Sequence, residues 1–432
     1  MADILPIRPW RYNKKLSASI DSLTSPRFDV LSEEQRNSLY QRPYNSIHLS
    51  VPQPPNAPER AAKLLQEWKR DGVLIQDEIP AMYVYYQYFS VAGSLQEYCR
   101  KGFICHIRAH DWDENVILRN ENIISDTIND QAELLNKTEW HTSPTHGLYT
   151  DSDFQLEPYM DEAITDPLYE TEDDQGVRNV LAVIHDAAII KKFISVLEDR
   201  SVILAEGHHL YESSLINKER QKSISPGNIP KAGYNFHLMY LTNTESSDYK
   251  ILPAHRLIKN LPHFNETEIV EKLKEDFTLE PVEDMNSLPD IIAGRPWVFG
   301  VMVREKAFKI QLKPESFSKL KWPIPEEVKR LDLTVMHYFI IEKILGIPEK
   351  EQQSENLDFD TSFSSCLKKV IQGEVQLALI TNEVTIEDVK RICHSGYTMP
   401  QKSTSFYPKV ISGFLFTSIH ESEFALPFYA PF

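Results

Sequence analysis

The spacing of apolar residues predicts an ordered series of strands and helices over the first part of the chain. Residues 81–89 are dense in aromatic and β-branched side chains, which is typical of a buried strand, and 101–107 has the pattern of a partner strand. Apolar residues recur every three to four positions across 59–68, which predicts a helix that Gly72 is suited to end. The same patterns predict strands at 47–51, 180–184, 201–205 and 236–242, and helices at 126–138, 187–197 and 210–222.

The pattern changes beyond about residue 260. Helices are predicted there at 267–277, 333–345 and 386–395, and strands at 297–303, 307–312 and 375–380. The acidic segment 157–176 lacks a regular period, and we expect a loop or an exposed helix. This mixed order indicates an α+β fold rather than a plain doubly wound sheet. We expect a ligand-binding domain over 1–259 and an α+β domain over 260–432.

The charge of the chain limits its partners. The 432 residues include 46 Lys and Arg against 63 Asp and Glu, a net charge of −17. An acidic surface repels phosphate backbones and anionic lipid head groups, so neither nucleic acid nor a membrane is an expected partner. A local basic pocket for one small phosphorylated ligand is compatible with this charge.

Cysteine use and hydropathy point to a cytoplasmic protein. The four cysteines form no CxxC pair, which is typical of a reducing compartment. No apolar run approaches the ~20 residues of a membrane helix, and the first residues lack the apolar core of a signal peptide. The sequence leaves the oligomeric state open.

The motif that most favours a ligand site is Glu206-Gly207-His208-His209, which follows a predicted strand and precedes a predicted helix. Backbone N–H groups at a helix start favour a bound anion, and Gly207 permits close approach to the backbone. His208 and His209 can donate hydrogen bonds or carry protons near neutral pH, and Glu206 can act as a general base. The alternative is a helix start whose two histidines only pack against neighbours.

Two further segments are candidates for phosphate binding. The apolar run 251–257 contains His255 and Arg256, and an arginine can hold a carboxylate or phosphate through two hydrogen bonds. A surface ion pair is the alternative. The loop 399–409 contains cations, hydroxyls and backbone N–H groups, the ingredients of phosphate capture, but lacks the glycines of a P-loop. Its candidate residues are Lys402, Ser403, Thr404 and Lys409.

Other chemistries have less support. Adjacent histidines such as His208 and His209 point in different directions on a helix, whereas metal pairs commonly lie three or four residues apart, so no metal site is expected. His141, Ser143 and His146 lack the motif of a serine hydrolase. Glu121 is a lone carboxylate by pattern.

The motifs at 205–212 and 399–404 give the chain a specific resemblance, over nearly its whole length, to a bacterial and archaeal family of uncharacterised proteins, domain of unknown function family 1015. Matching segments are 27–32, 44–49, 102–104, 143–144, 148–149, 176–177, 205–215, 251–258, 331–337, 345–347 and 396–409. The Gly-His-His segment is also similar to the Gly-His-[His/Arg]-Arg motif of the ParB/sulfiredoxin-like fold. That fold includes free-serine kinases, in which the motif cradles nucleotide phosphates.

These resemblances imply a ParB/sulfiredoxin-like core in the first domain, and ATP or ADP with Mg²⁺ as the cofactor. The neighbouring genes of the family imply a link to serine metabolism. This sequence departs from the family pattern, because Glu206 replaces Asp, Leu210 replaces Arg, Asn120 replaces His and Gln131 replaces Arg. Only Glu121 is kept from the upstream His-Glu-x-Thr motif.

The leading hypothesis is a small-molecule phosphotransferase, such as a kinase for serine or a related hydroxylated metabolite. Gly207, His208 and His209 would hold the donor's phosphates, and Arg256 with Lys402 and Lys409 would neutralise the transferred charge. Glu206 or Glu121 would orient the accepting hydroxyl or a Mg²⁺ ion. A non-catalytic sensor of a phosphorylated metabolite, or a phosphate-ester hydrolase, would use the same residues.

Overall fold

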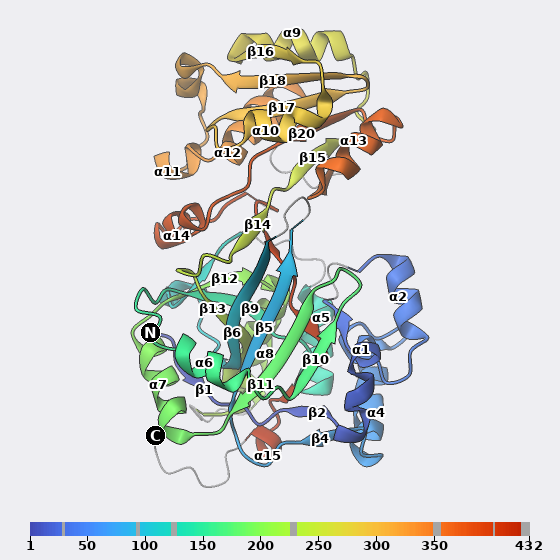
Figure 1. Ribbon diagram of the computed structural model, residues 1–432, viewed down its shortest axis with the longest axis vertical. Helices are drawn as coiled ribbons and strands as arrows, with labels where there is room; N and C mark the ends of the chain where they lie inside the picture. Colours follow the sequence, from blue (N-terminus) through green and yellow to red (C-terminus); the bar gives the residue numbers. More distant parts are fainter. Residues whose placement is uncertain are drawn as a thin grey trace. The chain divides into compact units, whose positions relative to one another are not determined.

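The structure, a computed structural model, describes residues 1–27, 31–91, 96–121, 128–224, 231–348, 356–400 and 402–424. The chain forms two units, each with its own sheet (Figure 1). The first unit comprises Met1–Arg119, Ile123–Tyr249 and Pro408–Phe432, and the second comprises Asn120–Asn122 and Lys250–Tyr407. The last segment, Pro408–Phe432, therefore belongs to the first unit. The expected division at residue 259 does not provide for this return of the chain. The expected α+β fold class is confirmed.

A mixed nine-stranded sheet forms the centre of the first unit. Its strand order is β10-β11-β5-β6-β13-β9-β12-β7, and β1 pairs with β6 outside this path. Neighbouring strands are antiparallel except β13 with β9 and β12 with β7. The strands are β1 (Ile4–Leu5), β5 (Met82–Ser90), β6 (Glu97–Arg108), β7 (Ile117–Arg119), β9 (Thr145–Tyr149), β10 (Tyr169–Glu172), β11 (Arg178–Ile184), β12 (Val202–Glu206) and β13 (Phe236–Asn243).

Helices and loops cover both faces of this sheet, so most side chains on either side of its strands are apolar. In β5, Met82 and Val84 pack on one face, under α6 (Glu157–Ala163), α7 (Ala187–Glu198) and α8 (His208–Ile224). Tyr83 and Tyr85 pack on the opposite face of the sheet, and we call this the closing face. It is covered by α1 (Ile20–Leu23), α4 (Ala57–Arg70) and residues 410–416. Figure 1 shows α6 and α7 on one side of β5 and β11, and α1 and α4 on the other.

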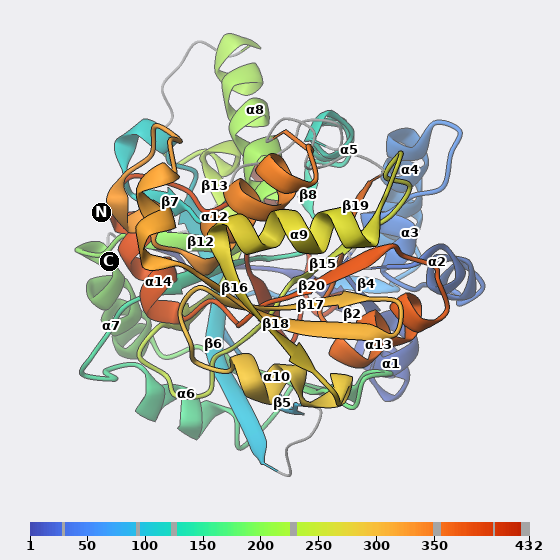
Figure 2. The same ribbon diagram turned by 90° about the horizontal axis from the view of Figure 1, so that it is seen from above.

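The second unit has a six-stranded sheet with the order β16-β18-β17-β20-β15-β19. Helix α9 (Glu266–Asp276) packs on one face, and α10 (Leu288–Ile292) and α13 (Phe363–Ile371) pack on the other (Figure 2). The strands are β15 (His255–Ile258), β16 (Phe277–Val282), β17 (Val298–Val303), β18 (Lys306–Leu312), β19 (Leu357–Asp360) and β20 (Leu377–Ile380). None of the described helices is long and apolar enough to cross a membrane.

Most predicted elements are confirmed. The helix expected at 59–68 is α4, and Gly72 follows its C-cap with a positive φ of 68°. The paired strands expected at 297–303 and 307–312 are β17 and β18. The helix expected at 386–395 is α14 (Ile386–His394), which Thr385 caps through a capping box.

The strand predicted at 47–51 was wrong. These residues form helix α3 (Ile47–Ser50). The side chain of Asn45 accepts the N–H of Ile47 at 3.0 Å, and the carbonyl of Ser46 accepts the N–H of Ser50. This local turn overrides the alternation of apolar residues that suggested a strand.

Two other expectations are corrected in part. Within 157–176, helix α6 is followed by the edge strand β10, in which buried Tyr169 and Thr171 alternate with exposed Glu170 and Glu172. The helix expected at 333–345 begins as α12 (Asp332–Met336) and continues as a π-helix, η7 (His337–Ile344).

Candidate functional site

The Gly-His-His turn joins the end of β12 to the start of α8. Glu206 is the last residue of the strand, and His208 is the first of the helix. Gly207 has a φ of 86°, and its carbonyl accepts the N–H groups of Leu210 and Tyr211 at 2.9 and 3.1 Å. A Cβ at this position would lie 2.7 Å from Cγ2 of Thr145, so both the conformation and the space require glycine. The positive end of the α8 dipole therefore lies directly beside Glu206.

Two cations from distant parts of the chain lie against the carboxylate of Glu206, which is 5% exposed. The ammonium of Lys409 donates to Oε1 of Glu206. The guanidinium of Arg27 has Nη1 at 3.7 Å from Oε2. Oε2 accepts no hydrogen bond within the described part of the chain. The structure thus brings Lys409, from the predicted C-terminal loop, to the predicted turn.

Polar side chains lie in two groups on the closing face, and the second group contains Glu206. Asn179, Gln87 and Arg100 lie on successive strands, because Asn179 pairs with Gln87 and Gln87 with Arg100. In the second group His146 pairs with Glu206, and through Tyr240 it aligns with Ile104, four residues along β6 from Arg100. We call Asn179, Gln87, Arg100, His146 and Glu206 the polar row. All five are buried among the apolar side chains of this face.

Hydrogen bonds connect the polar row to the segment that carries Lys409. The amide of Gln87 donates from Nε2 to Oδ1 of Asn179 at 2.9 Å and to the carbonyl of Lys409 at 3.0 Å. Its Oε1 accepts from Nη2 of Arg100. Gln87 therefore holds the backbone of Lys409 while Glu206 holds its ammonium.

The electrostatic surroundings of His146 are positive. Burial lowers the pKa of His146 well below its usual value, and the charges of Arg100, Arg27 and Lys409 lower it further. The ring is therefore neutral at physiological pH, and it exchanges a hydrogen bond of 2.8 Å with Oγ1 of Thr242. Three cations thus act on one neutral histidine, whereas Glu206 is the carboxylate paired with two of them.

The remaining candidate residues lie in the second unit. The carboxylate of Glu121 accepts the N–H of Lys402 at 2.7 Å, and the N–H and hydroxyl of Thr404 at 2.8 and 2.6 Å. The amide of Asn120 donates to Oγ1 of Thr404 at 2.8 Å. Ser403 donates to the carbonyl of Pro400. Glu121 therefore organises the loop that follows Met399, and its carboxylate is already occupied by these donors.

His255 and Arg256 begin β15, and neighbouring residues of a strand face opposite sides of the sheet. Arg256 is fully buried, and it donates to Nε2 of His337 at 3.1 Å and to the carbonyls of Ala254 and Lys402. Burial lowers the pKa of Arg256 to about 9, although the charge of Glu121 opposes this shift. Burial also lowers the pKa of His255 to about 4. In this arrangement Arg256 supports the loop around Lys402.

The predicted site residues therefore form two groups. Glu206, Gly207, His208, His209 and Lys409 belong to the first unit. Glu121, His255, Arg256, Lys402, Ser403 and Thr404 belong to the second. Reasoning from the sequence missed Arg100 and Gln87. A signal existed, since each polar residue occupies an inward-facing position of an apolar strand.

Comparison with known proteins identifies the family. The sequence profile of the family "Protein of unknown function (DUF1015)" matches residues 4–334. The chain belongs to this family. No curated protein matches it.

Several solved structures resemble this member of the family at low similarity. A mutant free serine kinase in complex with AMP is 13% identical, with a TM-score of 0.37, over 70% of this chain and 86% of that chain. A conserved hypothetical protein from Pyrococcus furiosus is 14% identical, with a TM-score of 0.36, over 74% and 97%. SbnI with C-terminal truncation from Staphylococcus aureus is 11% identical, with a TM-score of 0.35, over 73% and 87%.

Two positions at which this sequence departs from the expected family motifs lie together. Leu210 and Gln131 line one small cavity of about 20 Å³, beside Ser213 and His141. Where the motifs have arginine at both places, this chain has an apolar side chain and a neutral amide. Both positions, where the resemblance implies arginine, are therefore uncharged near the first turn of α8.

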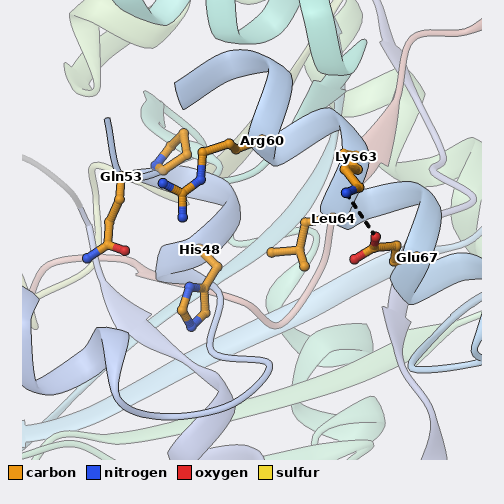
Figure 3. A pocket seen from close by; sticks show the side chains of 7 residues that line it. His48, Gln53, Arg60, Lys63, Leu64 and Glu67 are labelled. Atoms are coloured by element: carbon orange, nitrogen blue, oxygen red, sulfur yellow. Dashed lines mark ion pairs between the residues drawn. The ribbon is translucent and has the colours of Figure 1, made fainter. Parts of the chain in front are cut away.

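A larger hollow of the first unit shares no residue with the candidate site. It has a volume of about 310 Å³ and is lined by His48, Arg60, Lys63 and Glu67 among others (Figure 3). Lys63 forms an ion pair with Glu67 at 3.9 Å, and Arg60 donates to the carbonyl of Pro54. Two of its cations thus already have partners on the protein.

The described residues contain no group of three or more His, Cys, Asp or Glu side chains arranged to hold a metal ion. Mg²⁺ differs from other metals in this respect, because it commonly keeps several waters and binds through substrate phosphates with one or two carboxylates. Glu206 is a single carboxylate that already pairs with Lys409 and Arg27, so a Mg²⁺ ion at this site would be held mainly by the phosphates of the nucleotide.

Proposed function

We propose that this protein is a small-molecule phosphotransferase that transfers a phosphoryl group from a nucleotide to the hydroxyl of a small metabolite, with serine or a related compound as the acceptor. The observation that supports it best is the meeting of Lys409, Arg27 and the start of α8 at the carboxylate of Glu206. The cations and the helix N-terminus can neutralise phosphate charge, and the carboxylate can accept a hydrogen bond. Phosphoryl transfer needs both.

In this proposal the donor's terminal phosphate lies at the start of α8, beside Gly207, His208 and His209. The acceptor's hydroxyl oxygen attacks the phosphorus, the bond to the bridging oxygen breaks, and the nucleoside diphosphate leaves with the bond's electrons. Oε2 of Glu206 accepts the hydroxyl's hydrogen bond and then its proton, and Lys409 neutralises the transferred charge. Mg²⁺, when bound with the nucleotide, would neutralise further phosphate charge.

Glu206 suits the role of base better than Glu121. The Oε2 atom of Glu206 has no hydrogen-bond donor within the described part of the chain, so it can receive one from a substrate. Both oxygens of Glu121 accept hydrogen bonds from Lys402 and Thr404. The residues of the second unit therefore have no step in this scheme.

Thermal stability with Mg²⁺ and ATP, ADP or pyrophosphate tests the proposal. A ligand that binds only the folded state raises the melting temperature by mass action. We expect Mg-ATP to raise it for the natural protein and for His185→Ala, a control at an exposed histidine of the first unit, but not for His208→Ala. An equal rise with His208→Ala would exclude this site as the nucleotide site.

A non-catalytic sensor of a phosphorylated metabolite is the second candidate. The loss of positive charge at Leu210 and Gln131, which line one cavity, favours it, since a catalytic site would be expected to keep charge near the transferred group. Turnover separates the two functions: a phosphotransferase converts ATP when the acceptor is present, and a sensor binds its ligand without converting it.

A further inference from the structure

Arg100 has an unusual place on the closing face. It is 2% exposed, its Nη2 atom donates to the amide oxygen of Gln87, and a hydrogen bond with its side chain lowers the pKa of Tyr240 against the effect of burial. Its Nε and Nη1 atoms are buried without an acceptor in the described part of the chain, and Arg100 forms no ion pair there. Cζ of Arg100 lies 5.6 Å from the ring centroid of Tyr240. A guanidinium in this position loses its hydration without a compensating carboxylate, which is unfavourable.

The groups around Arg100 do not balance its charge. Burial raises the pKa of Tyr240 and Tyr249, so both are uncharged at neutral pH, although Arg100 partly opposes each shift. Burial keeps His146 neutral as well. Glu206 pairs with Lys409 and Arg27. The charged groups around His146, which are Arg100, Arg27, Lys409 and Glu206, therefore carry more positive than negative charge.

Lys409 is the group at the Glu206 end of the row that reaches solvent. The side chain of Lys409 is 26% exposed, whereas that of Glu206 is 5% exposed. Arg100, Arg27 and Lys409 all act on the same ring of His146, so an anion next to that ring is attracted by all three cations. An oxyanion can also accept the hydrogen bonds that Nε and Nη1 of Arg100 do not make within the protein.

We propose that the polar row binds an oxyanion group of the acceptor substrate, a carboxylate or a phosphate, through Arg100. This rests on the proposed phosphotransferase function and narrows its substrate class to hydroxylated metabolites that carry a second, anionic group. Arg100 anchors that group, while the hydroxyl lies toward Glu206 and the phosphate donor. Neutral polyols lack the group that Arg100 binds and are excluded as good acceptors.

Inorganic phosphate and D-glycerate, each matched for ionic strength with chloride, are the probes. They separate phosphate from carboxylate as the preferred oxyanion. The variants are Arg100→Met, Arg100→Lys and the control Arg108→Met. Arg108 lies on the same strand, β6, but is partly exposed and paired with Asp3 at 2.9 Å. Each variant is melted with and without the probes, and in parallel with Mg-ATP.

We expect at least one probe to raise the melting temperature of the natural protein and of Arg108→Met. In Arg100→Met the apparent affinity for that probe should fall about ten- to a hundredfold, because a charged hydrogen-bond donor is lost. The affinity of Arg100→Lys for the probe should lie between that of the natural protein and that of Arg100→Met. Without probe, Arg100→Met should melt at or above the natural protein, because an uncompensated buried charge is removed.

Three results would overturn the inference: no rise with either probe in the natural protein, the same rise in Arg100→Met, or a lower melting temperature of Arg100→Met without probe. The last result would mean that Arg100 is structural. The Mg-ATP measurement separates this inference from the proposed function. If Mg-ATP has no effect on any protein but the oxyanion effect still depends on Arg100, the phosphotransferase proposal fails and the oxyanion site remains.

Discussion

Replacing Gly207 with alanine tests whether the turn before α8 is fixed by both its backbone conformation and its packing. The φ of 86° is one that L-residues rarely adopt, and the left-handed conformation costs about 1–2 kcal/mol for a residue with a Cβ. The new Cβ would also lie 2.7 Å from Cγ2 and 3.0 Å from Cβ of Thr145, and overpacking of this kind costs about 1–3 kcal/mol. We expect the first unit to lose about 2–5 kcal/mol in all.

Gly72 provides a matched control in the same unit. Its φ is 68°, and a Cβ there would meet no atom within 4 Å. Gly72→Ala therefore carries the conformational cost without the overpacking. Urea unfolding of both variants, followed by circular dichroism, should show Gly207→Ala to be less stable than Gly72→Ala by about 1–3 kcal/mol.

A second substitution tests the assigned contact. Thr145→Ser removes Cγ2 but keeps the hydroxyl that bonds His237 at 3.0 Å. In a double-mutant cycle this change should recover part of the loss caused by Gly207→Ala and none of the loss caused by Gly72→Ala. Equal losses in the two glycine variants, or no coupling between positions 145 and 207, would refute the reasoning.

Two further predictions concern pH and the second unit. Burial lowers the pKa of His141 to about 4, so the unfolded chain takes up a proton near pH 6.5 that the folded first unit does not. The contribution of His141 to the stability of the first unit should be complete above about pH 6.5 and should be lost as the pH decreases toward 4. His141→Gln should reduce this slope in melting curves recorded across that range, and an unchanged slope would mean that His141 is protonated in the fold. In the second unit, Glu121→Gln should weaken the bonds to Lys402 and Thr404. The amides of both residues should then exchange with deuterium faster, whereas unchanged exchange would show that the loop does not depend on the charge of Glu121.

The sequence predicted most individual elements because their signals are local. The periodic apolar positions of α4 and the aromatic run of β5 each define an element without reference to the rest of the chain. The strand expected at 47–51 failed because the hydrogen bond from the N–H of Ile47 to the side chain of Asn45 is a local competitor that apolar spacing does not reveal.

The candidate site was predicted less completely, because its parts meet only through strand register. Gln87 and Arg100 are neighbours only because β5 pairs with β6 in one register, and shifting that register by one residue would turn one of them to the opposite face. The ion pair of Lys409 with Glu206 joins residues 203 positions apart, a separation at which sequence spacing carries no information.

The return of Pro408–Phe432 to the first unit has a consequence for biosynthesis. While the ribosome is still making the second unit, Glu206 and Gln87 have been synthesised but Lys409, which bonds both, has not. The short pairing of β22 (Ile411–Ser412) with β3 (Ser25–Pro26) must also wait. Domains usually fold as units in the order of synthesis. Here the unit that begins first is completed last, so a nascent chain that stalls before Lys409 would expose the closing face to chaperones and proteases.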